Sequence, residues 1–110
     1  MTTITIRNGK NGLCGFRVEG HSGYGTEGGD IVCASISSAV MLTVNGVMEV
    51  AKAPADFDVE DETATVSLAL SSTSAQDPVC AAFLRAFELH MQMLCEEFDQ
   101  YMKMEYEEVQ

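Results

Sequence analysis

Alternation of apolar and polar residues opens the chain and predicts a β-hairpin. In residues 2–7 two isoleucines fall on one face and the threonines and the arginine on the other, which is typical of a half-buried strand. Two Asn-Gly pairs follow in residues 8–12 and favour a tight turn. Residues 13–19 alternate again, and the side chains that we expect in the core are Cys14, Phe16 and Val18.

Residues 31–51 carry apolar side chains at helical spacing on most sides. We therefore expect one face of this helix to pack on the sheet and the other to meet a second helix or another subunit. Asn45-Gly46 lies inside the run and marks close packing or a bend, because glycine weakens a helix by roughly 1 kcal/mol relative to alanine. The face expected on the sheet comprises Ile36, Val40, Val44 and Val47.

A second helix is predicted from Asp77 to about Met102. Asp77 suits the N-cap and Pro78 the first helical position. Its apolar side chains form one stripe at spacings of three and four, namely Cys80, Leu84, Phe87, Met91, Leu94, Phe98 and Tyr101. The acidic tail, residues 105–110, is expected to fray.

Two short strands, residues 56–60 and 63–70, are predicted between the helices, with Phe57 and Val59 facing inward and a polar loop at 71–76. The order of elements is therefore strand, strand, helix, strand, strand, helix (ββαββα). We expect an α+β fold, a two-layer sandwich in which two long helices cover one face of a four-stranded sheet. A chain of 110 residues is expected to form one domain, residues 1–110.

The charge balance limits the kinds of molecule that the protein is expected to bind. Six lysines and arginines against seventeen acidic residues give a net charge of −11, which argues against nucleic acid and against an anionic membrane surface. The acidity either attracts a cationic partner such as a ribosomal protein or serves solubility alone. The N-terminus lacks a signal-peptide pattern, and polar residues interrupt the apolar runs, so we predict a cytoplasmic protein that does not span a membrane.

The four cysteines are widely spaced and contain no Cys-x-x-Cys pair. This spacing argues against a zinc ribbon or a thioredoxin-like motif, and no metal or cofactor is expected. In a reducing cytosol all four would be free thiols.

A glycine-rich loop separates a histidine from a cysteine. His21 ends the second strand, five glycines lie within residues 20–29, and Cys33 falls in the expected first turn of the following helix. The free N–H groups and dipole of a helix start favour a thiolate, and the same groups can stabilise an oxyanion. His21 would then act as general base and later as general acid. On position alone, a buried structural thiol and an ordinary loop histidine fit equally.

The sequence around this loop resembles the signature of the ribosomal-processing cysteine proteases, the Prp family. The first matching block is Gly20-His21-Ser22-Gly23-Tyr24, and the second is Gly28-Gly29-Asp30-Ile31-Val32-Cys33-Ala34, followed by Ser37. Val44-Asn45-Gly46-Val47 with Glu49-Val50 is also similar to the family. Ser35 stands where alanine is usual and Ile36 where valine is usual, and neither change removes a catalytic group.

The resemblance implies a set of site residues. His21 and Cys33 would be catalytic. Asp30 would either cap the helix or orient His21, and Ser37, one turn after Cys33, would hydrogen-bond within the site or to its own helix. The residues of the substrate loop would be Gly20, Ser22, Gly23, Tyr24, Gly28 and Gly29.

The implied activity is that of a cysteine endopeptidase. It would remove a short N-terminal extension, cut after an apolar and aromatic motif, from a bacterial large-subunit ribosomal protein. The family is dimeric, so a homodimer is expected. Two alternatives remain at this point, a non-catalytic dimeric module that binds a basic ribosomal protein and a thiol redox sensor.

Overall fold

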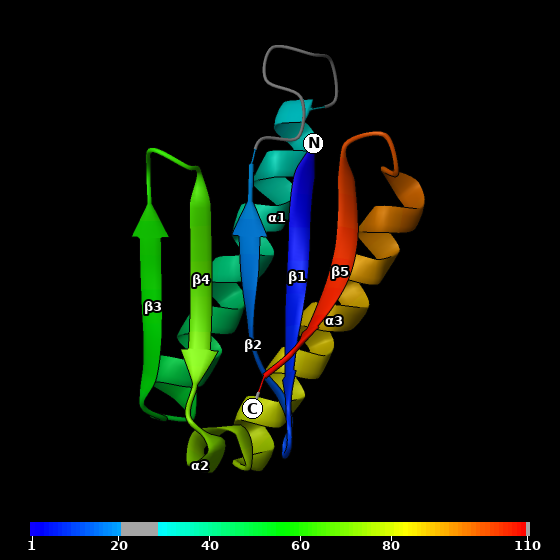
Figure 1. The fold of residues 1–110 in the computed structure, drawn as a ribbon. Coiled ribbons are helices and arrows are strands. Elements are labelled where there is room, and N and C mark those ends of the chain that lie inside the picture. Colours follow the sequence, from blue (N-terminus) through cyan, green and yellow to red (C-terminus); the bar gives the residue numbers. More distant parts are fainter. Residues whose placement is uncertain (21–28, 110) are drawn as a thin grey trace.

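The chain folds into a five-stranded sheet covered on one face by helices (Figure 1). This computed structural model describes residues 1–20 and 29–109, and of Asp30 it describes the backbone only. The strands are β1 (Thr2–Gly9), β2 (Gly12–Glu19), β3 (Ala55–Glu60), β4 (Thr65–Leu70) and β5 (Met102–Glu108). The helices are α1 (Gly29–Asn45), the π-helix η1 (Gly46–Val50), the short α2 (Ser72–Ala75) and α3 (Pro78–Glu97).

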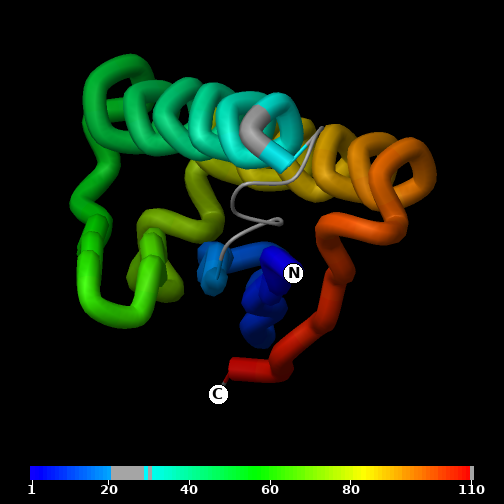
Figure 2. The backbone as a smooth tube through the Cα atoms, turned by 90° about the horizontal axis from the view of Figure 1, so that it is seen from above, coloured from blue at the N-terminus to red at the C-terminus, as the bar shows by residue number. Residues whose placement is uncertain are grey.

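The sheet is mixed, with the strand order β3-β4-β2-β1-β5. The predicted N-terminal hairpin is confirmed, because β1 and β2 pair antiparallel with Ile4 opposite Val18 and Ile6 opposite Phe16. Seen along the sheet, α1 and α3 form one layer over the strands (Figure 2). The α+β, two-layer character is therefore confirmed.

The core lies between the sheet and the two long helices. The sheet face predicted for α1 is confirmed, since Ile36, Val40, Val44 and Val47 are all buried. The stripe on α3 is buried from Cys80 to Leu94, and the ring of Phe87 stacks on that of Phe16 at a centroid distance of 4.2 Å. Asp77 caps α3 as predicted, and its Oδ1 accepts hydrogen bonds from the backbone N–H of Val79 at 2.8 Å and of Cys80 at 3.2 Å.

The prediction of a frayed C-terminal tail was wrong, because residues 102–108 form a fifth strand. Helix α3 ends at Glu97 rather than near residue 102, and β5 then runs parallel to β1 at the edge of the sheet. Met102 is buried, and the Tyr106 hydroxyl donates to Oε2 of the buried Glu88 on α3 at 2.7 Å. This hydrogen bond raises the pKa of Tyr106 and ties the strand to the helix. The four-stranded ββαββα order was therefore incomplete.

Two smaller predictions were also wrong. The predicted polar loop at 71–76 contains α2, whose N-cap Ser71 accepts from the backbone N–H of Ser74 at 3.1 Å. Ser74 is buried and its hydroxyl donates to the carbonyl of Pro54 at 2.8 Å, which explains how polar residues are accommodated there. Val59 was expected inside but is 53% exposed, because β3 is an edge strand and Val59 lies next to its last residue.

Glycine at position 46 allows α1 to approach α3. A Cβ atom there would lie 2.5 Å from the ring of Phe83 on α3, and the π-helical turn η1 begins at the same residue. The expectation that Asn45-Gly46 marks close packing is confirmed. The outer face of α1 and η1 carries exposed apolar side chains, which are Ile31, Met41, Leu42 and Met48.

Residues Ile31–Val50 form the one helix within the described part of the chain that is long and apolar enough to cross a membrane by length and composition. We had expected no such stretch. Core helices pass the same test, so this is weak evidence for a membrane span. The face of α1 that packs on the sheet accounts for part of this apolar composition, and the exposed apolar side chains of the outer face account for the rest.

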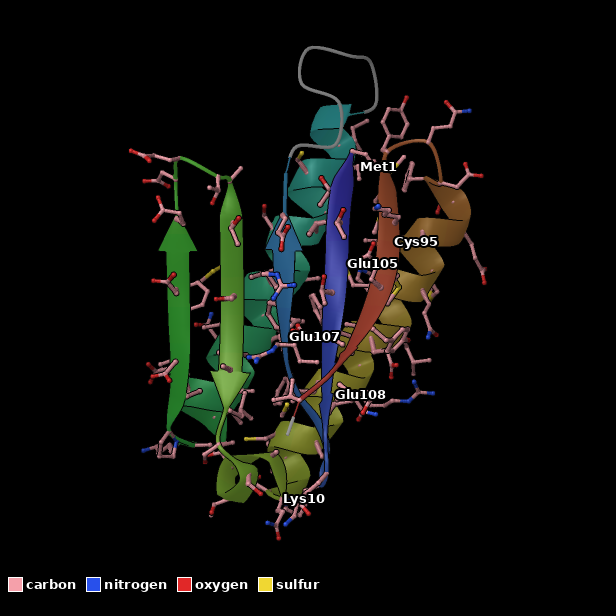
Figure 3. The ribbon with its side chains drawn as sticks, in the orientation of Figure 1. Met1, Lys10, Cys95, Glu105, Glu107 and Glu108 are labelled. Atoms are coloured by element: carbon pink, nitrogen blue, oxygen red, sulfur yellow. The ribbon has the colours of Figure 1, made fainter. Side chains whose placement is uncertain are left out.

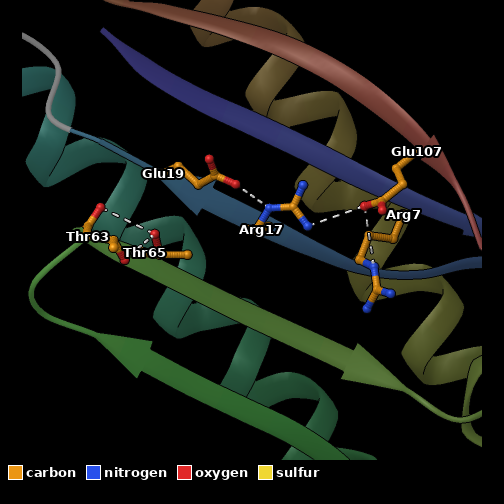
Figure 4. A network of polar contacts seen from close by, with 6 residues as sticks. All are labelled: Arg7, Arg17, Glu19, Thr63, Thr65 and Glu107. Atoms are coloured by element: carbon orange, nitrogen blue, oxygen red, sulfur yellow. Dashed lines mark hydrogen bonds and ion pairs between the residues drawn. The ribbon is translucent and has the colours of Figure 1, made fainter.

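The face of the sheet away from the helices is polar. Arg17 binds Glu19 on the same strand and Glu107 on β5, the latter at 3.3 Å, and Arg7 lies 3.8 Å from the same Glu107 oxygen (Figure 4). Such partly exposed pairs contribute little to stability, commonly below about 1 kcal/mol. They hold both arginines on the outer face of the sheet.

Candidate active site

One end of the sheet gathers the ends of four strands beside the start of α1. Strands β1 and β4 begin there and β2 and β3 end there, at the top of Figure 1. A cavity of about 290 Å³ lies at this end. It is lined by Thr2, Val18, Gly20, Cys33, Ile36, Ser37, Val59, Glu60, Asp61, Ala64, Thr65 and Val66.

Helix α1 brings Cys33 and Ser37 to this cavity together. They lie one turn apart on the same face, as their spacing predicts. We expected Cys33 in the first turn of the helix. It is the fifth residue of α1, because the helix already includes Gly29 and Asp30. Side chains of a helix lean toward its N-terminus, which partly offsets this longer separation from the helix start.

Gly20 directly follows β2. Hydrogen bonds hold both its N–H group and its carbonyl group. Its N–H donates to the carbonyl of Ala64 at 3.0 Å, and the Thr2 hydroxyl donates to its carbonyl at 3.5 Å. Its φ is +85°, and a Cβ atom would lie 2.9 Å from the carbonyl oxygen of Met1, so only glycine fits. The backbone is thus anchored at the cavity, immediately before position 21.

Most of the other predicted site residues lie outside the part of the chain that the structure describes, and only Gly29 and the backbone of Asp30 lie within it. His21, Ser22, Gly23, Tyr24 and Gly28 lie outside the described residues, as does the side chain of Asp30. Gly29 is the buried first residue of α1, and Asp30 is the second, inside the helix rather than before it as an N-cap would be. The structure therefore brings Gly20, Cys33 and Ser37 to one cavity.

Sequence reasoning missed the wall formed by β3, β4 and the turn between them. Val59, Glu60 and Asp61 carry no motif, and only the strand order brings them beside α1. Ala64 was expected in a strand, yet its φ of +50° is unusual for a residue other than glycine, and its carbonyl accepts from Gly20. The alternation of apolar and polar residues could have located the ends of these strands, but it could not have shown which helix they lie beside.

A smaller cavity of about 150 Å³ continues from the first between α1 and the β3–β4 hairpin. The two share Val18, Ile36, Ser37, Val59 and Val66, and the smaller one is also lined by Val40, Met41 and Phe57. We call these lining residues of the smaller cavity the apolar trough. The space beside Cys33 thus continues into a channel with mostly apolar walls.

The other three cysteines are placed differently. Cys14 and Cys80 are buried and Cys95, labelled in Figure 3, is half-buried on α3. Burial raises the pKa of all three thiols, and at Cys14 the nearby Arg7 partly opposes this effect. None of the four cysteines forms a disulfide, as expected. Within residues 1–20 and 29–109 no group of side chains is arranged to hold a metal ion.

A cysteine near the start of a helix, lining a cavity, is placed as a thiol nucleophile can be. The chain belongs to the Prp family, because the family model described as "Cysteine protease Prp" matches residues 1–103. It is accordingly a cysteine protease. No curated protein matches the chain.

Solved structures share its fold. SMU.848 from Streptococcus mutans is 24% identical with a TM-score of 0.88, and the match covers 99% of this chain and 96% of that one. The essential ribosomal processing protease Prp from S. aureus is similar in two complexes. With a covalently linked product peptide the identity is 22% and the TM-score 0.84, and with a substrate peptide they are 21% and 0.85. Both matches cover 97% of this chain and 100% of the other.

Proposed function

We propose that this cysteine protease removes the short N-terminal extension of a bacterial large-subunit ribosomal protein, with Cys33 as nucleophile and His21 as general base and acid. One observation carries the proposal. Cys33 and Gly20, the residue before His21, line the same cavity. Two hydrogen bonds hold the Gly20 backbone at this cavity, which supports a role there for the next residue in the sequence, His21.

The proposed reaction has two steps. The Cys33 thiolate attacks the carbonyl carbon of the cut bond, and the tetrahedral intermediate collapses to a thioester as His21 donates its proton to the leaving amine. The leaving amine is the trimmed ribosomal protein. Water then attacks the thioester with His21 as base, which releases the removed N-terminal extension and restores the thiol. Backbone N–H groups at the start of α1 would stabilise the oxyanion.

Three further groups have supporting roles in this proposal. Asp30 orients His21, because its position inside α1 leaves it unsuited to the N-cap role. Ser37 hydrogen-bonds within the cavity it shares with Cys33. The substrate loop, residues 20–29, contacts the peptide through Ser22, Gly23 and Tyr24.

The apolar trough supports a substrate with apolar side chains beside the cut bond. Its walls are made of valines, an isoleucine, a methionine and a phenylalanine, which match an extension with apolar and aromatic residues. The solved S. aureus relative is described as a ribosomal processing protease in complex with a substrate peptide, which supports the same class of substrate. A ribosomal substrate is made in the cytoplasm, and the proposal places the enzyme there.

The test is mass spectrometry of the ribosomal protein precursor after incubation with purified enzyme. Wild type is compared with Cys33→Ala, His21→Ala and the control Cys95→Ala, which removes a thiol on α3. We expect wild type and the control to release one defined N-terminal peptide and the other two variants to release none.

An uncut precursor with wild type would contradict the proposal. Co-elution of uncut precursor with the protein would then favour the binding module, and a reversible disulfide or sulfenate at Cys33 would favour the redox sensor. Cleavage that persists in Cys33→Ala would exclude this thiol as the nucleophile.

A further inference from the structure

The wall of the cavity opposite α1 is acidic. Glu60 is the last residue of β3 and Asp61 follows in the turn, and both are exposed while lining the cavity that holds Cys33. The Glu60 carboxylate accepts from the backbone N–H of Glu62 at 3.3 Å, so the turn itself orients the carboxylate. The cavity therefore presents two carboxylates to whatever lies against the cysteine.

No lysine or arginine among the described residues offsets them, and a protonated His21 would be the positive group that the proposed mechanism supplies. None of the residues described as lining the cavity is lysine or arginine, and residues 21–28 contain neither in the sequence. Arg7, Arg17, Arg85 and Lys103 are ion-paired on the sheet or on α3. Lys10 lies at the opposite end of the sheet from Met1 (Figure 3), and Lys52 follows η1, beyond the C-terminal end of α1.

The two carboxylates oppose negative charge at the reacting atoms, and a cation from the substrate would add to the positive charge that a protonated His21 supplies. The reactive form of a cysteine is the thiolate, and the tetrahedral intermediate also carries a negative charge. Carboxylates nearby repel both, and a cation bound between them and the reacting atoms converts that repulsion into attraction. A cationic substrate group would thus favour binding and reaction together.

We infer that Glu60 and Asp61 determine specificity by binding a lysine or arginine side chain of the substrate close to the cut bond. The inference rests on the proposed function, since it concerns the peptide at the same cavity. Successive residues of an extended peptide are about 3.3 Å apart, so a side chain that reaches this wall belongs to a residue within a few positions of the bond. The apolar trough and the acidic wall then recognise different residues of one peptide.

A lysine scan of the substrate tests the inference. Peptides that span the cut site carry either lysine or methionine at each position from three before to three after the bond. Cleavage by wild type, Glu60→Gln, Asp61→Asn and the double variant is compared through kcat/KM. The matched control is Asp58→Asn, an exposed carboxylate on β3 that does not line the cavity.

At one position we expect wild type to prefer lysine over methionine by about two- to fivefold, the upper part of the range for exposed ion pairs. The preference should shrink as salt rises, disappear in the double variant and persist in Asp58→Asn. Equal cleavage of both peptides by wild type, or a preference that survives in the double variant, would overturn the inference.

A measurement of peptide binding tests this inference separately from the proposed function. Fluorescence anisotropy of the same peptides with Cys33→Ala, in the presence and absence of the double substitution, reports the charge preference without any cleavage. If wild type cuts no peptide, the proposed function fails, and the anisotropy ratio of lysine to methionine peptides alone decides the role of the acidic wall.

Discussion

At the scale of single residues, the four thiols of this protein differ in their surroundings and not in their chemistry. Cys33 lines an open cavity at the start of a helix, whereas burial raises the pKa of Cys14, Cys80 and Cys95. A thiol with a raised pKa holds its proton at neutral pH, and the protonated form is not a nucleophile. The fold therefore buries Cys14 and Cys80, leaves Cys95 half-buried with a raised pKa, and places Cys33 in the cavity.

Alkylation with iodoacetamide should reveal this difference. Near pH 7 we expect Cys33 to be labelled first, with the other three at least about tenfold slower. Their rates should rise with pH, because the thiolate fraction increases as pH approaches a raised pKa from below. Peptide mapping by mass spectrometry measures each site, and denatured protein, in which all four should react alike, is the control. Labelling of Cys95 as fast as Cys33 in the folded protein would contradict the prediction.

The prediction of a histidine-cysteine pair came from sequence, because the glycine-rich loop and the two matching blocks around it are local. The acidic wall was not, because Glu60 and Asp61 belong to an ordinary turn and acquire a role only beside Cys33. Ala64 and Thr2 likewise gain significance through their hydrogen bonds to Gly20, which join residues far apart in sequence.

At the scale of elements, the contact between α1 and α3 depends on one glycine. In an isolated helix Gly46→Ala would be stabilising by about 1 kcal/mol. Here the added methyl group would lie 2.5 Å from the Phe83 ring, and such overpacking costs about 1–3 kcal/mol. We expect Gly46→Ala to lower the free energy of unfolding, with about 1–2 kcal/mol as the net result.

Urea unfolding followed by circular dichroism measures this effect. Asn45→Ala, an exposed neighbour on the same helix, is the control and should change stability little. A double-mutant cycle with Phe83→Leu identifies the cause, because the loss at position 46 should shrink when the ring is absent. Gly46→Ala as stable as wild type would show that the two helices adjust without strain.

The C-terminal strand shows why element prediction failed at one place. Residues 102–108 alternate, with Met102, Met104 and Tyr106 on one side, but three glutamates in that region gave it the composition of a disordered tail. Strand β5 forms because β1 offers a free edge and Glu88 on α3 accepts the Tyr106 hydroxyl. Both partners lie at least fourteen residues away in sequence, beyond what local alternation reports.

At the scale of the whole molecule, exposed apolar side chains on the two long helices support a homodimer. A cavity of about 690 Å³ between α1 and α3 is lined by Leu42, Phe83 and Phe87 among others, and Leu42 is 67% exposed. We expect light scattering to give twice the protomer mass of 11.9 kDa and Leu42→Glu to give the protomer mass.

Gln100→Glu is the matched control, because it adds the same charge at an exposed turn after α3 and should remain dimeric. Each copy carries a net charge of −11, so higher salt should strengthen the dimer by screening the repulsion. This salt effect is opposite in sign to the one expected for a cationic substrate. A wild-type protein with the protomer mass at every concentration and salt would contradict the prediction.

The sequence by itself determined the local structure and the candidate chemistry: the N-terminal hairpin, the N-cap of α3, the apolar stripes of the long helices, and the loop between His21 and Cys33. These depend on residues close together in the chain, where periodicity and turn preferences act. Only the tertiary structure decided the strand order, the fifth strand and the carboxylates that face Cys33. Those features depend on which edges and faces meet when apolar surface is buried, and no local pattern specifies that choice.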